Sequence, residues 1–386
     1  MRDHDLTLFG ATGFTGVLVA RYLAQHAEGT RIALAGRDLG KLEGVKRAMV
    51  AVDPRAEAVT LVKASLGDEA GLRAMAERTR CLVTTVGPYA QLGADALKAA
   101  VKGRCDYVDI TGEPNFVRDS IVAWHDEAQA EGLRIVHCGG FDSVPHDVGV
   151  YETVRALEGA DDIRVEGFVR ASGAPSGGTW NSAIDAFSKL RSRADVRLPL
   201  IAHPGRHVSL GPSRLKYRRD LGGWQAPLPT IDPQIVLRSA SAMPVYGSRF
   251  VYAHHALVRS TAYLLGGALG LGTLVALAQL DGARNWLKSL NSSGEGPSAA
   301  RRARSWFRCV FVGEGQGRRV ETVVAGKDPG YDETAKMLAE CALGLVHDRA
   351  RLPAITGVLS PVAALGPALS DRLRAASITL TTRNLS

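Results

Sequence analysis

The sequence predicts an α/β protein with two parts, a doubly wound parallel sheet at the N-terminus and a second α+β domain that contains an antiparallel sheet. Three observations support this prediction. A glycine-rich turn follows the first apolar strand, and short apolar strands alternate with helices up to residue 138. Longer strands with alternating polarity follow after residue 150.

Strands and helices alternate regularly in the first part of the chain. The strands read as nearly continuous apolar runs, which is typical of strands buried on both faces of a parallel sheet. The connecting helices would then cover both faces. We expect strands at 5–10, 31–35, 59–63, 81–86, 107–110 and 133–138, and helices at 15–25, 39–49, 68–77, 94–102 and 116–132.

The second part of the chain has longer strands and fewer helices. We expect a strand at 163–171, a helix at 180–191, a hairpin of strands at 305–313 and 318–325, and a helix at 331–346. These patterns divide the chain into three segments. They are a first domain over 1–150, a second domain over 151–350, and a C-terminal segment over 351–386 that packs back on the first domain.

One segment of the second part, residues 260–280, contains no charged residue. As a helix rising about 1.5 Å per residue, it is long enough to cross the roughly 30 Å apolar core of a bilayer. Three interpretations stay open, namely a helical hairpin buried in the fold, an element that dips into a membrane surface, and a single membrane span. The span is the least favoured, because it would separate the hairpin expected at 305–325 from the rest of its domain.

The charge is distributed unevenly along the chain. Residues 1–150 carry a formal charge of −3, and residues 151–386 carry +11, which accounts for the overall +8. A basic surface can attract a nucleic acid, an anionic membrane or an acidic partner. A solvated basic surface explains the same composition, and we expect no nucleic-acid partner.

The cysteine pattern indicates a reducing compartment. The five cysteines form no Cys-x-x-Cys pair, so neither a disulfide framework nor a zinc site is expected. The first residues run directly into a strand without a signal-peptide pattern, which favours a cytoplasmic protein. His203 and His207 are separated by a Pro-Gly pair that denies them a helix, so we expect no bound metal.

The strongest motif is a glycine loop between the first strand and the first helix. Glycines at this point let the backbone turn tightly and approach a pyrophosphate, and the helix N-terminus offers free N–H groups to the phosphates. We therefore predict a Rossmann dinucleotide-binding domain. The loop consists of Gly10, Ala11, Thr12, Gly13, Phe14, Thr15 and Gly16.

The end of the second strand indicates which dinucleotide binds. NAD-binding domains usually carry an acidic residue there, which holds the ribose 2′-hydroxyl. This chain has Gly36 and then Arg37, which leave room for a 2′-phosphate and offer it a charged fork. Lys41, one turn into the next helix, can assist. We therefore expect NADPH, although Arg37 could also be a surface arginine paired with Asp38.

The ends of later strands supply further candidates, because ligands of such sheets bind beyond the carboxyl ends of the strands. Tyr89 is the candidate proton donor, with a turn tyrosine as the alternative. Other polar groups could be catalytic or could simply cap helices. The turn after the fourth strand is Val86, Gly87, Pro88 and Tyr89, and the other polar groups are Thr111, Glu113, Asp142, Ser143 and the glycine-rich run 176–179.

Together these motifs resemble the saccharopine dehydrogenase-like oxidoreductases, and most of all the actinobacterial trans-acting enoyl reductases. The resemblance covers nearly the whole chain. It rests on Gly-Ala-Thr-Gly-Phe-Thr-Gly at 10–16, Ala-Gly-Arg at 35–37, Thr-Val-Gly-Pro-Tyr at 85–89, Tyr-Val-Asp-Ile-Thr-Gly-Glu at 107–113 and Gly-Gly-Phe-Asp-Ser-Val-Pro at 139–145.

The resemblance implies an NADP-binding Rossmann domain and a second α+β domain. It also implies reduction of a carbon–carbon double bond in an acyl chain held by a polyketide synthase that lacks its own working reductase. The products would be long-chain lipids. The cofactor residues carry over onto Gly10, Gly13, Gly16, Arg37 and the 86–89 turn.

The function expected from the sequence is therefore that of an NADPH-dependent oxidoreductase acting on an acyl thioester in lipid biosynthesis. Its partner would be a polyketide synthase carrier domain, with peripheral contact to the inner face of a membrane through residues 260–280. The chain has no Tyr-x-x-x-Lys pair, the usual proton donor of short-chain dehydrogenases. Two alternatives stay open, an amino-acid oxidoreductase of the saccharopine type and a membrane-associated Rossmann protein without catalysis.

Overall fold

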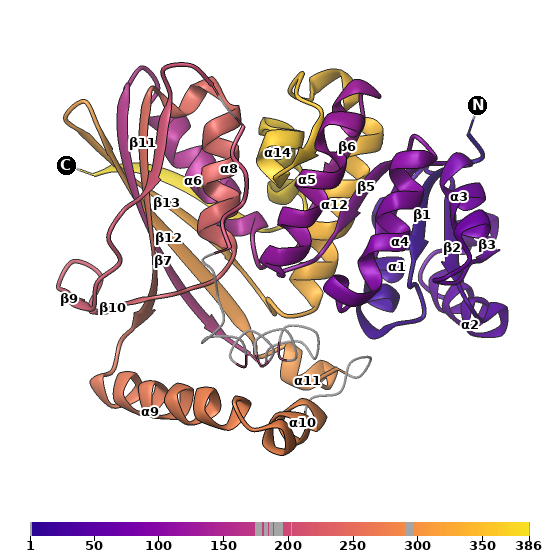
Figure 1. Ribbon diagram of the computed structural model, residues 1–386, viewed down its shortest axis with the longest axis horizontal. Coiled ribbons are helices and arrows are strands. Elements are labelled where there is room, and N and C mark those ends of the chain that lie inside the picture. Colours follow the sequence, from indigo (N-terminus) through magenta and orange to yellow (C-terminus); the bar gives the residue numbers. More distant parts are fainter. Residues whose placement is uncertain are drawn as a thin grey trace. The chain divides into compact units, whose positions relative to one another are not determined.

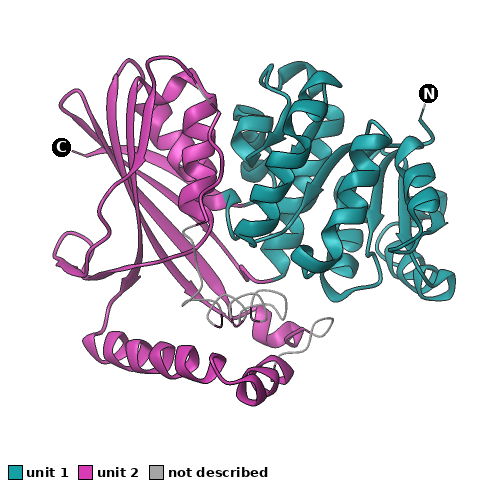
Figure 2. Cartoon of the chain, viewed as in Figure 1, with its two compact units in different colours: residues 1–144, 331–377 teal, residues 145–330, 378–386 magenta. Residues whose placement is uncertain are grey.

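The computed structural model describes residues 2–173, 180, 184, 188, 196–201, 203–290 and 296–385. The chain forms two units, each built from two separate stretches of sequence (Figure 2). Unit 1 comprises residues 1–144 and 331–377, and unit 2 comprises residues 145–330 and 378–386. The sequence patterns divide the chain at 150 and 350, whereas in the structure the segment from Tyr331 onward returns to unit 1 and the last strand belongs to unit 2.

Unit 1 contains a parallel sheet of seven strands in the order β14-β6-β5-β4-β1-β2-β3 (Figure 1). This order confirms the predicted doubly wound sheet. The strands are β1 (His4–Phe9), β2 (Ile32–Gly36), β3 (Thr60–Lys63), β4 (Thr79–Thr84), β5 (Asp106–Asp109), β6 (Arg134–Val136) and β14 (Gly357–Leu359).

The first five helices of unit 1 lie close to the ranges that the apolar pattern predicts, whereas α12 corresponds to the helix expected at 331–346 in the second domain, and α13 and α14 were not predicted. The short 3-10 helices are Pro54–Ala58 and Arg349–Arg351. The α-helices are α1 (Phe14–His26), α2 (Leu39–Val50), α3 (Glu69–Glu77), α4 (Tyr89–Lys102), α5 (Pro114–Ala130), α12 (Asp332–His347), α13 (Pro361–Leu365) and α14 (Pro367–Ala375).

Burial explains why residues far apart in the sequence share unit 1. Strand β1 lies inside the sheet between β4 and β2 and is buried at all six positions, so its two faces must both be covered by helices. Helix α12 packs against α1, β4 and α14, and thirteen of its sixteen residues are buried. The returning segment therefore completes the core that the first 144 residues leave open, and β14 extends the sheet beside β6.

Unit 2 is built on a mixed sheet of eight strands. Along the sheet the order is β15-β13-β12-β7-β11-β10-β9, and β8 pairs with β11. The predicted hairpin is confirmed as β12 and β13, while β7 and β11 run parallel. The strands are β7 (Asp162–Ser172), β8 (His207–Leu210), β9 (Lys216–Arg218), β10 (Gly223–Pro227), β11 (Arg249–Val258), β12 (Trp306–Gly315), β13 (Arg318–Gly326) and β15 (Thr379–Leu385).

The helices described in unit 2 lie in three places along the chain: α6 precedes β7, α8 lies between β10 and β11, and α9 to α11 lie between β11 and β12. The helix expected at 180–191 lies almost entirely outside the described residues. A 3-10 helix spans Pro244–Tyr246. The α-helices are α6 (Val144–Ala156), α8 (Asp232–Ala242), α9 (Thr261–Ala278), α10 (Asp281–Ser289) and α11 (Ala299–Arg302).

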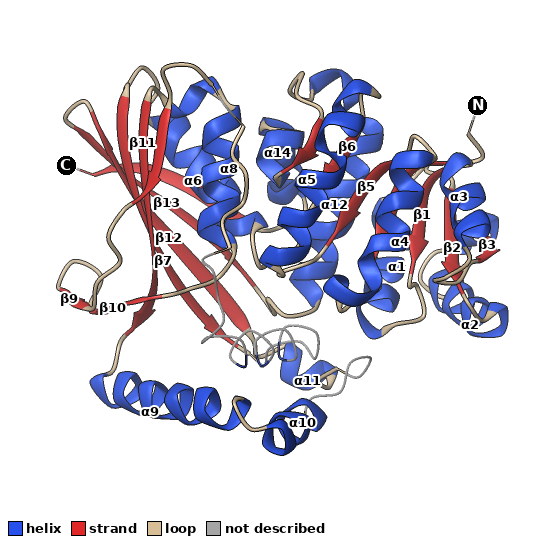
Figure 3. Ribbon diagram, viewed as in Figure 1, coloured by secondary structure: helices blue, strands red, loops and turns tan. Residues whose placement is uncertain are grey.

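Helix α9 is the apolar segment noted in the sequence. It starts where the Ser260 side chain accepts from the Tyr263 N–H, and only 6% of it is buried. The interpretation as a hairpin buried inside the fold is therefore wrong. Figure 3 shows α9 as a single helix followed by α10, away from the strands of the sheet. By length and composition alone, α9 is the one helix of the described residues that could cross a membrane.

Candidate functional site

The glycine loop connects β1 to α1 and makes hydrogen bonds to the ends of β2 and β4. Gly10 has a φ of +86°, and a Cβ there would lie 2.7 Å from Val86 Cγ2. Its N–H donates to the Ala35 carbonyl, and its own carbonyl accepts from Thr85 Oγ1. Only glycine fits such a conformation and such a close approach. The loop therefore presents bare backbone at the carboxyl edge of the sheet.

Helix α1 begins in this loop without a side-chain cap. Gly13 is the N-cap residue, and it makes no side-chain cap hydrogen bond. A Cβ on Gly16 would lie 2.9 Å from Ala11 Cα, so the helix start packs closely on the loop. The N-terminus of a helix that follows such a loop is a common place for an anion to bind.

The second strand ends as the prediction of NADP binding requires. Gly36 is buried, while Arg37 and Lys41 are exposed. The Asp38 carboxylate caps α2 by accepting the Lys41 N–H at 3.0 Å. In the part of the chain that the structure describes, Asp38 makes this bond and no ion pair with Arg37. Arg37 is therefore an exposed arginine directly after β2, and its contact with a 2′-phosphate stays a prediction.

The turn after β4 contains a cis peptide bond between Gly87 and Pro88. Next to it, the buried Tyr89 hydroxyl donates to the Thr84 carbonyl at 3.0 Å and lies 3.5 Å from the Ile110 N–H. Burial, reinforced by Asp109, raises the pKa of Tyr89 far above its ordinary value. This geometry favours a hydroxyl that holds the ends of β4 and β5 together over one that delivers a proton.

Two other candidates from the sequence, Glu113 and Thr111, make structural hydrogen bonds to backbone N–H groups. The Glu113 carboxylate accepts the N–H groups of Tyr89 at 2.9 Å and Ala90 at 3.0 Å, which caps α4. Thr111 Oγ1 accepts the Glu113 N–H. Asp142 and Ser143 follow β6, and Ser143 is fully buried. The run 176–179 lies outside the described residues.

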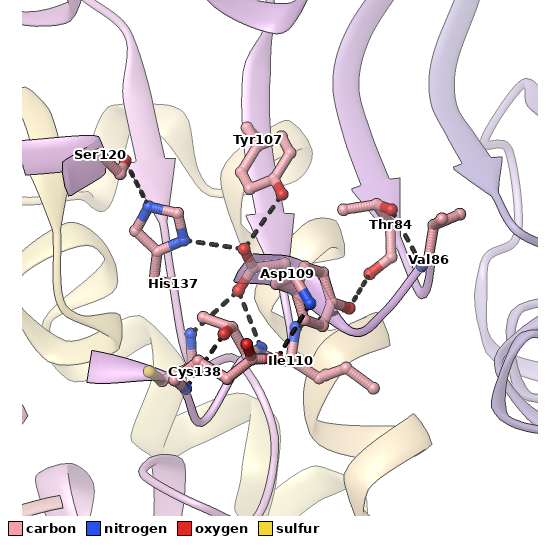
Figure 4. Close-up of polar contacts among 11 residues, drawn as sticks. Thr84, Val86, Tyr107, Asp109, Ile110, Ser120, His137 and Cys138 are labelled. Atoms are coloured by element: carbon pink, nitrogen blue, oxygen red, sulfur yellow. Dashed lines mark hydrogen bonds and ion pairs between the residues drawn. The ribbon is translucent and has the colours of Figure 1, made fainter. Parts of the chain in front are cut away.

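A buried polar network that the sequence did not indicate lies between β5 and β6 (Figure 4). Asp109 Oδ2 accepts from the Tyr107 hydroxyl at 3.0 Å and lies 2.7 Å from His137 Nδ1. The other ring nitrogen of His137 lies 2.7 Å from Ser120 Oγ. Asp109 Oδ1 accepts the N–H groups that follow each strand, at Thr111 and Cys138.

This serine–histidine–aspartate order is that of a hydrolase triad, but its burial gives it another role. Asp109 and His137 have no exposed surface, and Ser120 is 3% exposed. A nucleophile must reach its substrate, and this hydroxyl does not reach the surface. The network instead fixes the ends of β5 and β6 through one fully hydrogen-bonded carboxylate. No local sequence pattern signals it, because its members come from two strands and a helix.

Comparison with known proteins agrees with this geometry. Residues 6–136 match the saccharopine dehydrogenase NADP binding domain, a range that includes the glycine loop, Arg37 and the 86–89 turn. A Mycobacterium tuberculosis protein that carries the provisional name of trans-acting enoyl reductase is 36% identical, over 100% of this chain and 99% of its own length.

Two further comparisons cover essentially the whole chain. The trans-acting enoyl reductase of Mycobacterium bovis is 34% identical over 100% of this chain and 99% of its own. Saccharopine dehydrogenase (L-Glu forming) from Saccharomyces cerevisiae, in its apo form, has the same fold, with a TM-score of 0.55 at 14% identity, over 99% of this chain and 100% of that one.

Proposed function

Because the chain belongs to the family of the trans-acting enoyl reductases and carries their saccharopine dehydrogenase NADP-binding domain, we propose that it reduces the carbon–carbon double bond of an acyl thioester. The chain is an NADP-dependent oxidoreductase. The observation that carries the proposal is the bare glycine loop with Arg37 beside it, in a chain that resembles these reductases along its whole length.

The residues of the glycine loop fit the proposed cofactor. A Cβ at Gly10 would collide with Val86 and Thr85, so glycine is what lets the loop pass this close to the end of β4 on its way into α1. The first turn of α1 would hold the pyrophosphate, and Arg37 with Lys41 would hold the 2′-phosphate. Val86, Gly87 and Pro88 would lie next to the nicotinamide ribose. Bound NADPH supplies the hydride.

The protein's own part in the reaction is to position the reacting groups and to stabilise the charge that develops on the substrate. Reduction of an enoyl thioester at its β-carbon leaves an enolate, which backbone N–H groups can stabilise. The α-carbon must then gain a proton. Tyr89 is the donor expected from the sequence, but its hydroxyl is engaged with Thr84. We assign the proton to water and give Tyr89 the task of holding the turn.

The substrate we propose is an acyl chain presented by the carrier domain of a polyketide synthase. The names of the relatives describe them as trans-acting, which means that they work on a chain held by another protein. Residues 151–386 carry a formal charge of +11, which suits an acidic carrier surface. The rate on carrier-bound substrate should therefore fall with salt, whereas the rate on a free thioester should change little.

Contact with a membrane surface is the second part of the proposal. Helix α9 has a mean hydropathy of 1.7 and is almost wholly exposed. Tyr263, Leu265 and Leu269 are each at least 66% exposed, and Trp286 of the following helix α10 is exposed as well. Proteins rarely leave so long an apolar surface in water. We place α9 in the interfacial region of a bilayer, where lipid-linked products would be handled.

Turnover of purified protein with NADPH and a set of enoyl thioesters tests the function. We expect the double bond to be reduced, with carrier-bound substrates preferred over the coenzyme A esters. Saccharopine and its precursors serve as the control, and they should not be converted. Conversion of the amino acids with no reduction of any enoyl thioester would reject the proposal.

A further inference from the structure

Three buried side chains that the proposed reaction does not use converge inside unit 2. His146 comes from α6, Asp232 is the first residue of α8, and His254 lies in β11. Their exposed fractions are 2%, 3% and 4%. One ligand atom from each lies within 4.8 Å of the other two. Three elements that are distant in sequence therefore meet at one buried polar point.

The distances within this cluster suit a metal ion better than a hydrogen-bonded chain. His146 Nδ1 lies 3.6 Å from Asp232 Oδ1, and His254 Nε2 lies 3.5 Å from Asp232 Oδ2. Both distances are at or beyond the outer limit of a hydrogen bond. Ligand atoms bonded to a tetrahedral ion at about 2.0–2.2 Å lie about 3.2–3.6 Å from one another. The two nitrogen–oxygen distances fall in this range, each to one of the two Asp232 oxygens, and the ligand atoms of the two histidines lie within 4.8 Å of each other.

The surroundings also match those of a metal site, in which outer partners orient the ligands. The Tyr252 hydroxyl lies 2.8 Å from His254 Nδ1, so a proton on that nitrogen leaves Nε2 with the lone pair that faces the cluster. Thr230 Oγ1 donates to Asp232 at 2.5 Å. Cys309 Sγ lies 3.8 Å from His146 Nε2, on the side of the ring away from the carboxylate.

The chemistry of the cluster suits a cation. Two imidazole rings and one carboxylate are gathered at a point where each residue is at most 4% exposed. A carboxylate so deep in a protein is costly unless it is hydrogen-bonded and accompanied by a cation.

We propose that His146, Asp232 and His254 bind a divalent first-row transition-metal ion, for which Zn²⁺ is the probe. Two imidazoles and one carboxylate are a known ligand set for such ions. The ion would tie α6 and α8 to β11 inside unit 2. The spacing of these three residues along the chain gives no sign of the site. It does not involve His203 or His207, the pair that the sequence analysis considered and rejected as metal ligands.

The test uses the full chain, stripped with a chelator and then dialysed against Zn²⁺. Asp232→Asn and His254→Gln each remove one ligand at nearly constant volume. The matched control is His255→Gln, because His255 is the next residue of β11, is also fully buried, and stacks on Phe168 at 5.2 Å instead of joining the cluster.

We expect wild type and His255→Gln to bind one Zn²⁺ per chain. The two ligand variants should bind at least 100-fold more weakly, which exceeds the roughly 10–100-fold loss typical of an outer partner. Should the ligand variants fail to fold, Tyr252→Phe keeps all three ligands and should weaken Zn²⁺ binding about tenfold. Folded wild type without bound Zn²⁺, or ligand variants that bind as well as the control, would overturn the proposal.

Substitution with Co²⁺ tests the ligand set itself. The Cys309 sulfur lies 3.8 Å from the far nitrogen of His146, on the side of the ring away from the carboxylate. The expected spectrum is therefore that of nitrogen and oxygen ligands alone. A thiolate-to-cobalt charge-transfer band would overturn the three-residue set.

Discussion

Arg37 stands exposed at the end of β2, and the Asp38 carboxylate beside it is occupied with the cap of α2. Charge-assisted hydrogen bonds from an arginine are worth about 1.5–3 kcal/mol each. Arg37→Ala should therefore weaken NADPH binding by roughly 10- to 150-fold and leave NADH binding nearly unchanged. Titration of nicotinamide fluorescence measures both. Arg47→Ala, at an exposed arginine of the following helix α2, is the control, and equal losses for the two nucleotides would contradict the assignment.

Gly10 is the position where the loop tolerates no side chain. Its positive φ and the 2.7 Å approach to Val86 make Gly10→Ala both strained and crowded. A residue forced into this conformation costs about 1–3 kcal/mol. We expect a lower melting temperature and a loss of nucleotide binding. Gly44→Ala in α2 is the control, because nothing lies within 4 Å of its added Cβ and it should be neutral or stabilising.

Tyr89→Phe distinguishes a structural role of the Tyr89 hydroxyl from a role as the proton donor. Loss of the hydrogen bond to Thr84 should cost about 0.5–1.5 kcal/mol of stability. It should lower kcat only modestly and leave the pH profile of kcat unchanged. A proton donor would instead lose about 10²- to 10⁴-fold in kcat with no change in stability. That second result would restore the role expected from the sequence.

Residues of the candidate site were predictable where they follow one another in the chain. The loop from Gly10 to Gly16 and the Gly36–Arg37 pair could be recognised because strand, turn and helix are local. The Asp109–His137–Ser120 network and the His146–Asp232–His254 cluster could not, because only the folded sheets bring their members together.

At the scale of elements, the helices and strands of residues 4–136 lie close to their expected positions, since each is an apolar run between turn residues. Helix α4 begins five residues earlier than expected, because Glu113 from a distant turn caps it at Tyr89. The addition of β14 to the first sheet and the parallel pairing of β7 with β11 could not be predicted. Both depend on contacts between segments far apart in sequence.

Helix α9 carries the prediction that belongs to this scale. Leu265→Glu together with Leu269→Glu should abolish flotation with anionic vesicles, because a leucine that moves from water into an apolar environment gains about 1.5–3 kcal/mol. Two such losses should weaken vesicle binding by at least about 100-fold. The melting temperature should not change, since both side chains are exposed.

The matched control for α9 is Leu210→Glu with Leu215→Glu, two exposed leucines elsewhere in unit 2. This variant should float as wild type does. Wild-type protein that stays in the aqueous fraction, or α9 variants that still float, would show that the exposed helix serves another partner.

At the scale of the whole molecule, the chain combines an acidic nucleotide-binding part with a basic second part that bears an apolar helix. The sequence predicted the two-part α/β class because composition and element rhythm both change near residue 150. Where the chain returns to complete unit 1 was not predictable, because the burial of α12 depends on a core that the earlier residues leave open.

The central claim, hydride transfer from NADPH to an enoyl thioester, is tested most directly by isotope transfer. The protein is incubated with NADPH deuterated at C4 and a carrier-bound enoyl thioester. Mass spectrometry then shows which carbon of the product carries the deuterium. Our account predicts one deuterium at the β-carbon, none in reactions with Gly10→Ala, and little when deuterated NADH replaces NADPH. Tight NADPH binding without any deuterium in the acyl chain, or deuterium at a carbon next to nitrogen in an amino-acid substrate, would contradict it.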